Sequence, residues 1–104
     1  MKRFVLHSYL KPEKVEDYIC LHAEPWPELM ELLEESHIHH YSISVRGTEV
    51  FTYYEYTGDD FEADNQRMNE SAVMQRWWLY SKPCFLYHEE GRYYDVMTEI
   101  FYKE

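Results

Sequence analysis

The chain has 104 residues, which suits a single domain over 1–104 and is too short for two. Hydrophobic residues make up 45 % of the sequence and aromatic residues 18 %, a composition that excludes a disordered chain. The formal charge of −10 argues against nucleic acid and anionic membrane surfaces as partners, because both are bound through basic patches.

The first third of the chain predicts a strand and an interrupted helix. Residues 3–9 alternate and are rich in β-formers, which is typical of a strand. Lys11-Pro12-Glu13 then begins a helix, with proline at a tolerated first-turn position. Pro25 and Pro27 must interrupt that helix, and Pro27 can begin a second piece that continues to about Ser36.

The remainder predicts a hairpin, two further helical pieces and a last strand. Arg46-Gly47-Thr48 is expected to form the turn between strands over 39–45 and 50–56. Asp60 and Ser71 are suitable caps for helices over 61–69 and 72–81. Residues 84–92 are expected to form a loop, and 95–102 the last strand.

The predicted order β-α-β-β-α-β is that of an α+β, ferredoxin-like subunit, an antiparallel four-stranded sheet with helices on one face. The uncovered face of such a sheet can line a pocket or be buried against a second subunit. A bare face this rich in aromatic residues would be a large exposed apolar patch, which favours a homodimer.

Cysteine usage and hydropathy bear on the cellular compartment. Cys20 and Cys84 are too few for a disulfide framework and do not form a CxxC motif. We find neither a signal peptide nor an apolar run long enough to span a membrane. These features predict a reduced, cytoplasmic environment.

The first helix carries a candidate acid–base group. Tyr18 and His22 are four residues apart, so they project from the same helical face, which Val15 and Ile19 also share. An imidazole has a reference pKa of about 6.5 and can both give and take protons near neutrality. A helical histidine on an apolar face is nevertheless more often structural than catalytic, and Tyr18 alone would more often be a core residue.

Further aromatic residues have two possible roles on pattern alone. Trp77 and Trp78 point about 100° apart on a helix, so one can be core while the other faces a pocket. Tyr41 lies on a strand and is as consistent with the core as with a ligand site. Trp26 is expected to pack between its two prolines, and Arg76 to pair with an acidic residue at the dimer surface.

Four segments together resemble the L-rhamnose mutarotase family, in the same order and spacing over nearly the full chain. They are Tyr18…His22…Trp26-Pro27-Glu28-Leu29, Tyr41-Ser-Ile, Gln75-Arg76-Trp77-Trp78 and Glu99-Ile-Phe101-Tyr102. The resemblance implies a dimeric α/β-barrel of ferredoxin-like subunits that interconverts the α and β anomers of a 6-deoxy-sugar without a cofactor or metal. It also implies that His22 is the catalytic acid and that the sugar is contacted by Tyr18, Tyr41, Trp77 and Trp78.

One segment departs from the family pattern. Family members usually carry an Asn-Pro-Asp-Asn-Ser-Pro-like loop before the last strand, whereas this chain reads Pro83-Cys-Phe-Leu-Tyr-His-Glu-Glu-Gly91. If that loop shapes the sugar pocket, the preferred sugar differs, and L-fucose or another deoxy-hexose becomes an alternative to L-rhamnose.

Two clusters of titratable residues could indicate a metal site or a glycosidase site. The spacing of His37, His39 and His40 matches no common zinc pattern, so we expect solvent-facing imidazoles there. The Glu89-Glu90 pair is expected to be a solvated loop, because glycosidase chemistry needs two separated carboxylates flanking one bond.

Mutarotation requires a base for the anomeric O1–H and an acid for the ring oxygen, and no redox step. A neutral sugar is not repelled by the net charge, whereas a phosphorylated sugar would be unless a local basic pocket overrode that field. Two alternatives stay open: another dimeric α/β-barrel enzyme, such as a cofactor-free or haem-degrading monooxygenase, and a non-catalytic sugar-binding module. The module would bind sugar saturably without accelerating anomer exchange.

Overall fold

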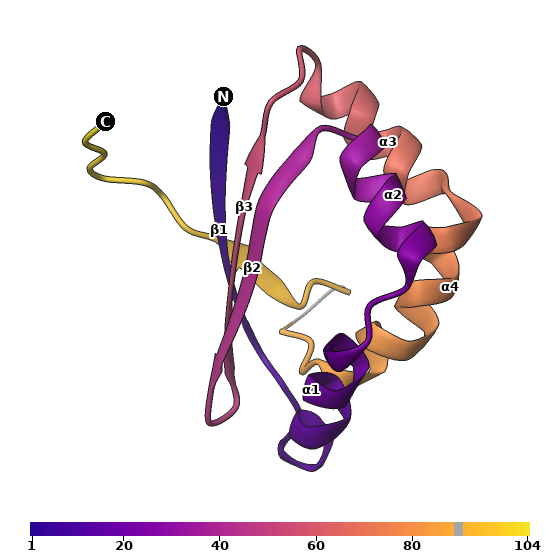
Figure 1. Ribbon diagram of the computed structural model, residues 1–104. Helices are drawn as coiled ribbons and strands as arrows, with labels where there is room; N and C mark the ends of the chain where they lie inside the picture. Colours follow the sequence, from indigo (N-terminus) through magenta and orange to yellow (C-terminus); the bar gives the residue numbers. More distant parts are fainter. Residues whose placement is uncertain (89–90) are drawn as a thin grey trace.

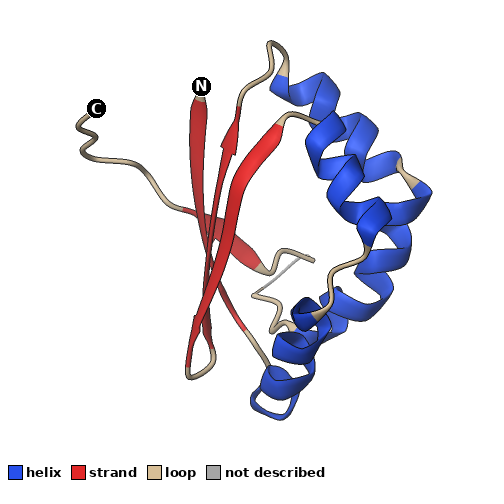
Figure 2. Ribbon diagram, in the orientation of Figure 1, coloured by secondary structure: helices blue, strands red, loops and turns tan. Residues whose placement is uncertain are grey.

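The computed structural model describes residues 1–88 and 91–104 and contains one antiparallel four-stranded sheet with all the labelled helices on one side (Figures 1 and 2). The spatial order of the strands is β2-β3-β1-β4. The strands are β1 (Lys2–Tyr9), β2 (Ile38–Arg46), β3 (Glu49–Tyr56) and β4 (Tyr94–Val96). The helices are α1 (Val15–Ala23), α2 (Pro27–Glu35), α3 (Phe61–Glu70) and α4 (Ala72–Ser81), with 3-10 turns η1 (Pro12–Lys14) and η2 (Lys82–Cys84).

This arrangement confirms the predicted α+β, ferredoxin-like order, with each crossover helix divided in two. Prolines and side-chain caps set the divisions. Pro27 occupies the first turn of α2, where a missing N–H costs nothing. Asp60 accepts a hydrogen bond from the Ala63 amide, and Ser71 accepts one from the Val73 amide, so α3 and α4 each begin at a predicted cap.

The period of two in the strands divides the sheet into an inner face toward the helices and an outer face away from them. On β1 and β3, paired positions such as Phe4 with Tyr54 and Leu6 with Thr52 are inner. Arg3, paired with Glu55, lies on the outer face. The positions of these strands that border the helices are therefore uncharged, whereas the outer face carries charged residues together with aromatic ones.

A bulge in β2 changes which residues face the helices. The pairing with β3 shifts between His39 and Ser42, and His40 adopts a left-handed backbone with φ of 51°. Strict alternation from the buried Ile38 would send Tyr41 to the outer face. The inserted residue reverses that parity, so Tyr41 stacks on Tyr54 with the ring centroids 5.4 Å apart.

The core contains two clusters of buried residues. Leu10, Tyr18 and Val50 belong to one cluster, with Cys84 and Phe85. Leu29, Met74 and Trp77 form the other, which joins α2 to α4. Tyr18 and Trp77 therefore help to hold the fold together and also border the space between sheet and helices.

The predicted last strand over 95–102 is wrong for most of its length. Only Tyr94–Val96 pairs with β1, the Met97 amide adds one hydrogen bond to the Val5 carbonyl, and the segment then leaves the sheet (Figure 1). Arg3 binds this segment through its side chain, with an ion pair to Glu99 at 2.9 Å and its guanidinium 3.5 Å from the Tyr102 ring centroid. These side-chain contacts hold the tail without a backbone ladder.

The structure also bears on several smaller predictions from the sequence. Ile19, expected on the apolar face of the first helix, is 51 % exposed, because its neighbour Tyr18 takes the inward direction. The predicted loop over 84–92 includes the end of η2 and a bridge between Leu10 and Phe85, and Glu89-Glu90 lies outside the described residues. Cys20 and Cys84 are both free thiols. No helix in the described ranges has the length and apolarity needed to cross a membrane.

Candidate active site

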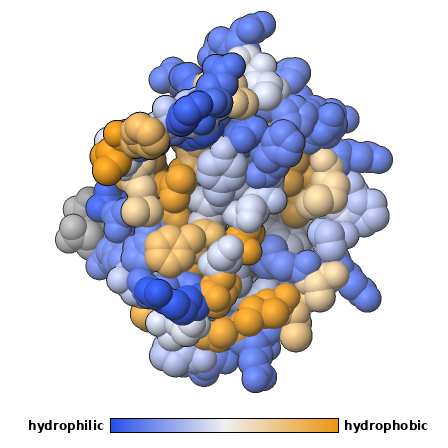
Figure 3. All heavy atoms as spheres, turned by 60° about the vertical axis from the view of Figure 1, so that its left-hand side comes forward, coloured by the Kyte–Doolittle hydropathy of each residue, from blue (hydrophilic) through white to orange (hydrophobic). Residues whose placement is uncertain are grey.

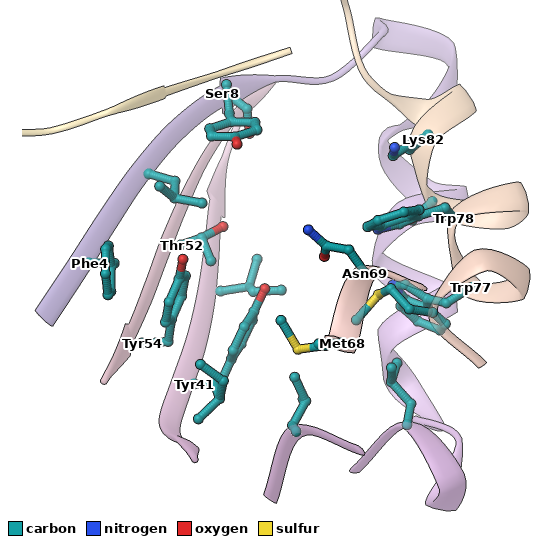
Figure 4. A pocket seen from close by; sticks show the side chains of 18 of the residues that line it. Phe4, Ser8, Tyr41, Thr52, Tyr54, Met68, Asn69, Trp77, Trp78 and Lys82 are labelled. Carbon is teal, nitrogen blue, oxygen red and sulfur yellow. The ribbon is translucent and has the colours of Figure 1, made fainter. Parts of the chain in front are cut away.

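A cavity of about 740 Å³ separates the inner face of the sheet from the helices (Figure 4). Its sheet wall carries Tyr41, Thr52 and Tyr54, and its helix wall carries Trp77 and Trp78 (Figure 4). A volume of this order is typical of small-molecule sites. Every residue that the sequence proposed for the site borders this cavity: Tyr18, His22, Tyr41, Trp77 and Trp78.

His22 is held in one orientation on α1. Its Nδ1 lies 2.8 Å from the backbone carbonyl oxygen of Tyr18, and a carbonyl can only accept, so Nδ1 carries a proton and donates it. In the neutral imidazole the lone pair is therefore on Nε2. The ring lies between Tyr18, at 4.5 Å between centroids, and the edge of Trp77, at 5.3 Å. This geometry fixes both the tautomer and the position of a potential base.

The phenols that border the cavity are kept neutral. Burial raises the pKa of Tyr18 and of Tyr41 above the ordinary value of a tyrosine, and the nearby Tyr41 and Tyr54 phenols, respectively, add smaller contributions. Burial also raises the pKa of Tyr54 and of Tyr93 to about 12. Near neutral pH these hydroxyls are hydrogen-bond donors and acceptors without charge, which suits an uncharged polyol.

Both tryptophans of the QRWW segment border the cavity, but they differ in burial, and Trp77 is also a core residue. Trp77 is buried in the α2–α4 cluster, with its ring edge-on to His22 and to Trp26. Trp78 is half-buried, and the ammonium of Lys82 lies 3.8 Å from its ring centroid. Successive residues can both reach the cavity because it extends along the inner side of α4.

Polar residues that the sequence analysis did not single out complete the wall. Ser8 and Thr52 bring hydroxyls from the inner face of the sheet, and Asn69 brings an amide from the end of α3 (Figure 4). Lys82 brings the ammonium from η2. The alternation of β1 and β3 could have predicted that the Ser8 and Thr52 hydroxyls face the cavity. The four-residue spacing between Trp78 and Lys82 could have predicted that Lys82 lies on the same side of the helix as Trp78.

The residues expected to be structural are engaged within the chain. Trp26 packs edge-on to Trp77 with centroids 5.2 Å apart, as predicted. Arg76 forms an ion pair with Glu28 at 3.1 Å and lies over the Trp26 ring, so its acidic partner belongs to the same chain. This cluster joins the beginning of α2 to α4 behind the cavity wall.

The three clustered histidines have separate partners. His39 lies 3.3 Å from Glu34, and His40 lies 2.7 Å from Glu55. His37 packs edge-on against Tyr56. Across the described ranges, no group of three or more histidine, cysteine or acidic side chains is arranged to hold a metal ion.

Comparison with known proteins shows the family of the chain. The family model for L-rhamnose mutarotase matches residues 3–103 of the chain. The chain belongs to the L-rhamnose mutarotase family. It is therefore an isomerase-type, anomer-interconverting enzyme by family membership, and the resemblance noted in the sequence is confirmed.

Individual relatives cover most of the chain. An L-rhamnose mutarotase of Bacillus subtilis is 29 % identical over 103 residues, covering 98 % of each protein. One from Pectobacterium carotovorum is 36 % identical over 81 residues, covering 76 % of this chain and 73 % of that protein. Another from Oceanobacillus iheyensis is 28 % identical over 106 residues, covering 99 % of this chain and 97 % of the relative.

Solved structures support the fold of this family member. The crystal structure of an L-rhamnose mutarotase from Formosa agariphila covers 100 % of both chains with a TM-score of 0.80 and 20 % identity. An antibiotic biosynthesis monooxygenase covers 96 % of this chain and 99 % of its own, with a TM-score of 0.58 and 17 % identity. At these identities the likeness concerns the fold alone, so the monooxygenase match carries no activity over to this chain.

Proposed function

We propose that this protein interconverts the α and β anomers of L-rhamnose or a close 6-deoxy-hexose, with His22 as the acid–base group. The observation that carries the proposal is the orientation of His22, whose Nδ1–H is donated to the Tyr18 carbonyl while its ring borders the cavity. Family membership supplies the reaction type, and the uncharged phenols and indoles around the ring suit a neutral sugar.

The chemistry needs one proton removed and one delivered. Nε2 of neutral His22 takes the proton from the anomeric O1–H as the C1–O5 bond breaks and the O1–C1 bond becomes a carbonyl. The resulting imidazolium delivers that proton to O5, which leaves the open-chain aldehyde and restores neutral His22. Rotation about C1–C2 presents the other carbonyl face, and the same steps in reverse close the ring as the second anomer.

The neighbouring groups hold the sugar during these steps. The neutral Tyr18 and Tyr41 hydroxyls donate hydrogen bonds to ring or hydroxyl oxygens, since their pKa values are raised. The Trp77 and Trp78 indoles offer apolar faces to the C–H edge of the ring and to the C6 methyl. No residue in this scheme transfers electrons, so the proposal includes no cofactor.

NMR magnetisation exchange between the α and β anomers tests the proposal, with L-rhamnose and L-fucose measured in parallel. We expect a rate above buffer for at least one of them. Exchange at the buffer rate for every deoxy-sugar would refute mutarotase activity. Saturable sugar binding without faster exchange would instead establish the non-catalytic module.

We also propose a homodimer formed through the outer face of the sheet, which no helix of the structure covers (Figure 1). Phe51 and Tyr53 lie on this face, and in the C-terminal segment Ile100 is 94 % exposed and Phe101 79 %. Figure 3 brings the sheet side of Figure 1 forward and shows hydrophobic residues there between hydrophilic ones. Covering them would stabilise a domain of this size.

Sedimentation velocity tests the dimer with a pair of variants. We expect a dimer for the natural chain, a monomer for Phe51→Glu, and a dimer for Leu79→Glu, which places the same charge at a helix position that is 73 % exposed. A natural chain that sediments as a monomer at micromolar concentration would refute this part of the proposal.

The partners and the cellular compartment that we propose for the protein are based on its net charge and its cysteine thiols. The net charge of −10 opposes binding to nucleic acid or anionic membranes, and the exposed free thiol of Cys20 suits a reduced, cytoplasmic compartment.

A further inference from the structure

The cavity differs in charge from the rest of the molecule. The chain holds 20 acidic residues and a net charge of −10. Among the described residues, no aspartate or glutamate borders the cavity, and the basic side chains that border it are His22 and Lys82. The field of the whole protein repels anions, whereas this wall attracts them. Lys82 is thus the local basic group that a negatively charged sugar would need.

The position of Lys82 is set by α4 and η2. It follows Trp78 by four residues, and its Nζ lies 3.8 Å from the Trp78 ring centroid. Figure 4 shows its amine above Trp78 on the helix side of the cavity. Within the described part of the chain Lys82 forms no ion pair. The ammonium therefore lies beside Trp78, and Trp77 and His22 border the same cavity with their rings 5.3 Å apart.

We propose that this site, beyond a 6-deoxy-hexose, accepts reducing sugars that carry a carboxylate at C6, and that Lys82 is the residue that determines this specificity. The inference rests on the proposed function, because it uses the same site and the same anomeric chemistry. A half-buried ammonium without a carboxylate partner gains a charge-assisted hydrogen bond when such a sugar binds.

A carboxylate fits this wall better than a phosphate does. A hexuronate brings one negative charge, which a single lysine balances, while a sugar phosphate brings up to two and meets the repulsion of the whole chain. The C6 position is suitable because C5, which carries C6, is bonded to the ring oxygen O5 that His22 protonates. A substituent at C6 therefore starts near His22, and Lys82 borders the same cavity.

Three sugars with the same ring configuration test the proposal: L-fucose, L-galacturonate and L-galactose 6-phosphate, which differ only at C6. Binding is followed by tryptophan fluorescence, since Trp77 and Trp78 border the cavity. We expect a Kd for L-galacturonate that is about tenfold or more below that of L-fucose. Equal or weaker binding of L-galacturonate, or tighter binding of the phosphate, would overturn the proposal.

Variants assign the effect to Lys82. In Lys82→Gln the ratio of the Kd for L-fucose to the Kd for L-galacturonate should fall to about one, and Lys82→Arg should keep the ratio of the natural chain. Lys14→Gln, which removes the same charge outside the cavity, is the matched control and should behave as the natural chain. If Lys82→Gln weakens both sugars equally, Lys82 does not determine specificity.

Anomer exchange of L-rhamnose, L-fucose and L-galacturonate is measured on the same samples. A failure with both deoxy-sugars would refute the proposed function, whereas the fluorescence titration needs no turnover and judges the carboxylate preference by itself.

Discussion

The two faces of the sheet are formed by the same strands but differ in the charge of their side chains. On β1 and β3 the inner positions Leu6, Thr52 and Tyr54 are uncharged and border the cavity. At outer positions of the same strands, His7 is hydrogen-bonded to Glu49 at 3.1 Å and Arg3 forms an ion pair with Glu99 at 2.9 Å. A strand period of two is enough to separate a strongly acidic sequence from its own binding site. Net charge is therefore a poor guide to the polarity of a cavity.

The largest expected effect is a loss of anomer exchange on substitution of His22, which borders the cavity on the inner side of the sheet. His22→Gln keeps a side chain of similar size but removes the titratable nitrogen, so we expect anomer exchange to fall by roughly 10²- to 10⁴-fold. NMR magnetisation exchange measures the loss, and circular dichroism checks that the fold is kept. A variant with full activity would remove His22 from the mechanism and leave the mutarotase assignment in place.

The Tyr18→Phe variant removes the hydroxyl group beside His22 and keeps the aromatic ring. The phenyl ring keeps its packing in the core cluster, while a hydrogen bond to the sugar is lost, so we expect up to about a tenfold decrease in kcat/KM. Tyr41→Phe on the sheet wall is the matched variant and should lose a comparable amount. Unchanged kinetics in both would mean that these phenols only enclose the site.

The buried phenols predict a stability change at alkaline pH. Burial raises the pKa of Tyr54 and Tyr93 from 10 to about 12, so the folded chain retains protons that the unfolded chain has lost. The contribution of these two phenols to the free energy of unfolding is complete below pH 10 and is lost as the pH rises to 12. The free energy of unfolding from urea titrations should fall over this range. Tyr54→Phe should reduce the fall, and the exposed Tyr102→Phe is its control.

The smallest effect is expected on the outer face. Hydrogen bonds from Arg46 and His7 hold the pKa of Glu49 below its ordinary value of 4.5. The stability that this carboxylate contributes is present above that value and is lost as the pH falls through the lowered pKa. Glu49→Gln should therefore be slightly less stable than the natural chain at pH 7, with the difference vanishing in acid, and anomer exchange at pH 7 should not change. A large loss of exchange would contradict the separation of the two faces.

Local signals in the sequence were sufficient for most of the fold. Prolines, caps and alternation placed the helices and three of the four strands, because each of these signals acts over a few residues. The last strand failed for the opposite reason: Ile100 and Phe101 have strand-forming side chains, but no neighbouring strand pairs with that segment. Pairing depends on a partner distant in the sequence, which alternation does not report.

The Tyr18–His22 spacing, the QRWW segment and their order along the chain were enough to predict the residues of the candidate site. Which side chains face the cavity depended on the tertiary structure. The bulge at His40 turns Tyr41 inward, α4 brings both Trp77 and Trp78 to the cavity, and η2 adds Lys82. The physical reason is that composition fixes how many charges a chain has, whereas backbone geometry and packing fix which of them a bound ligand meets.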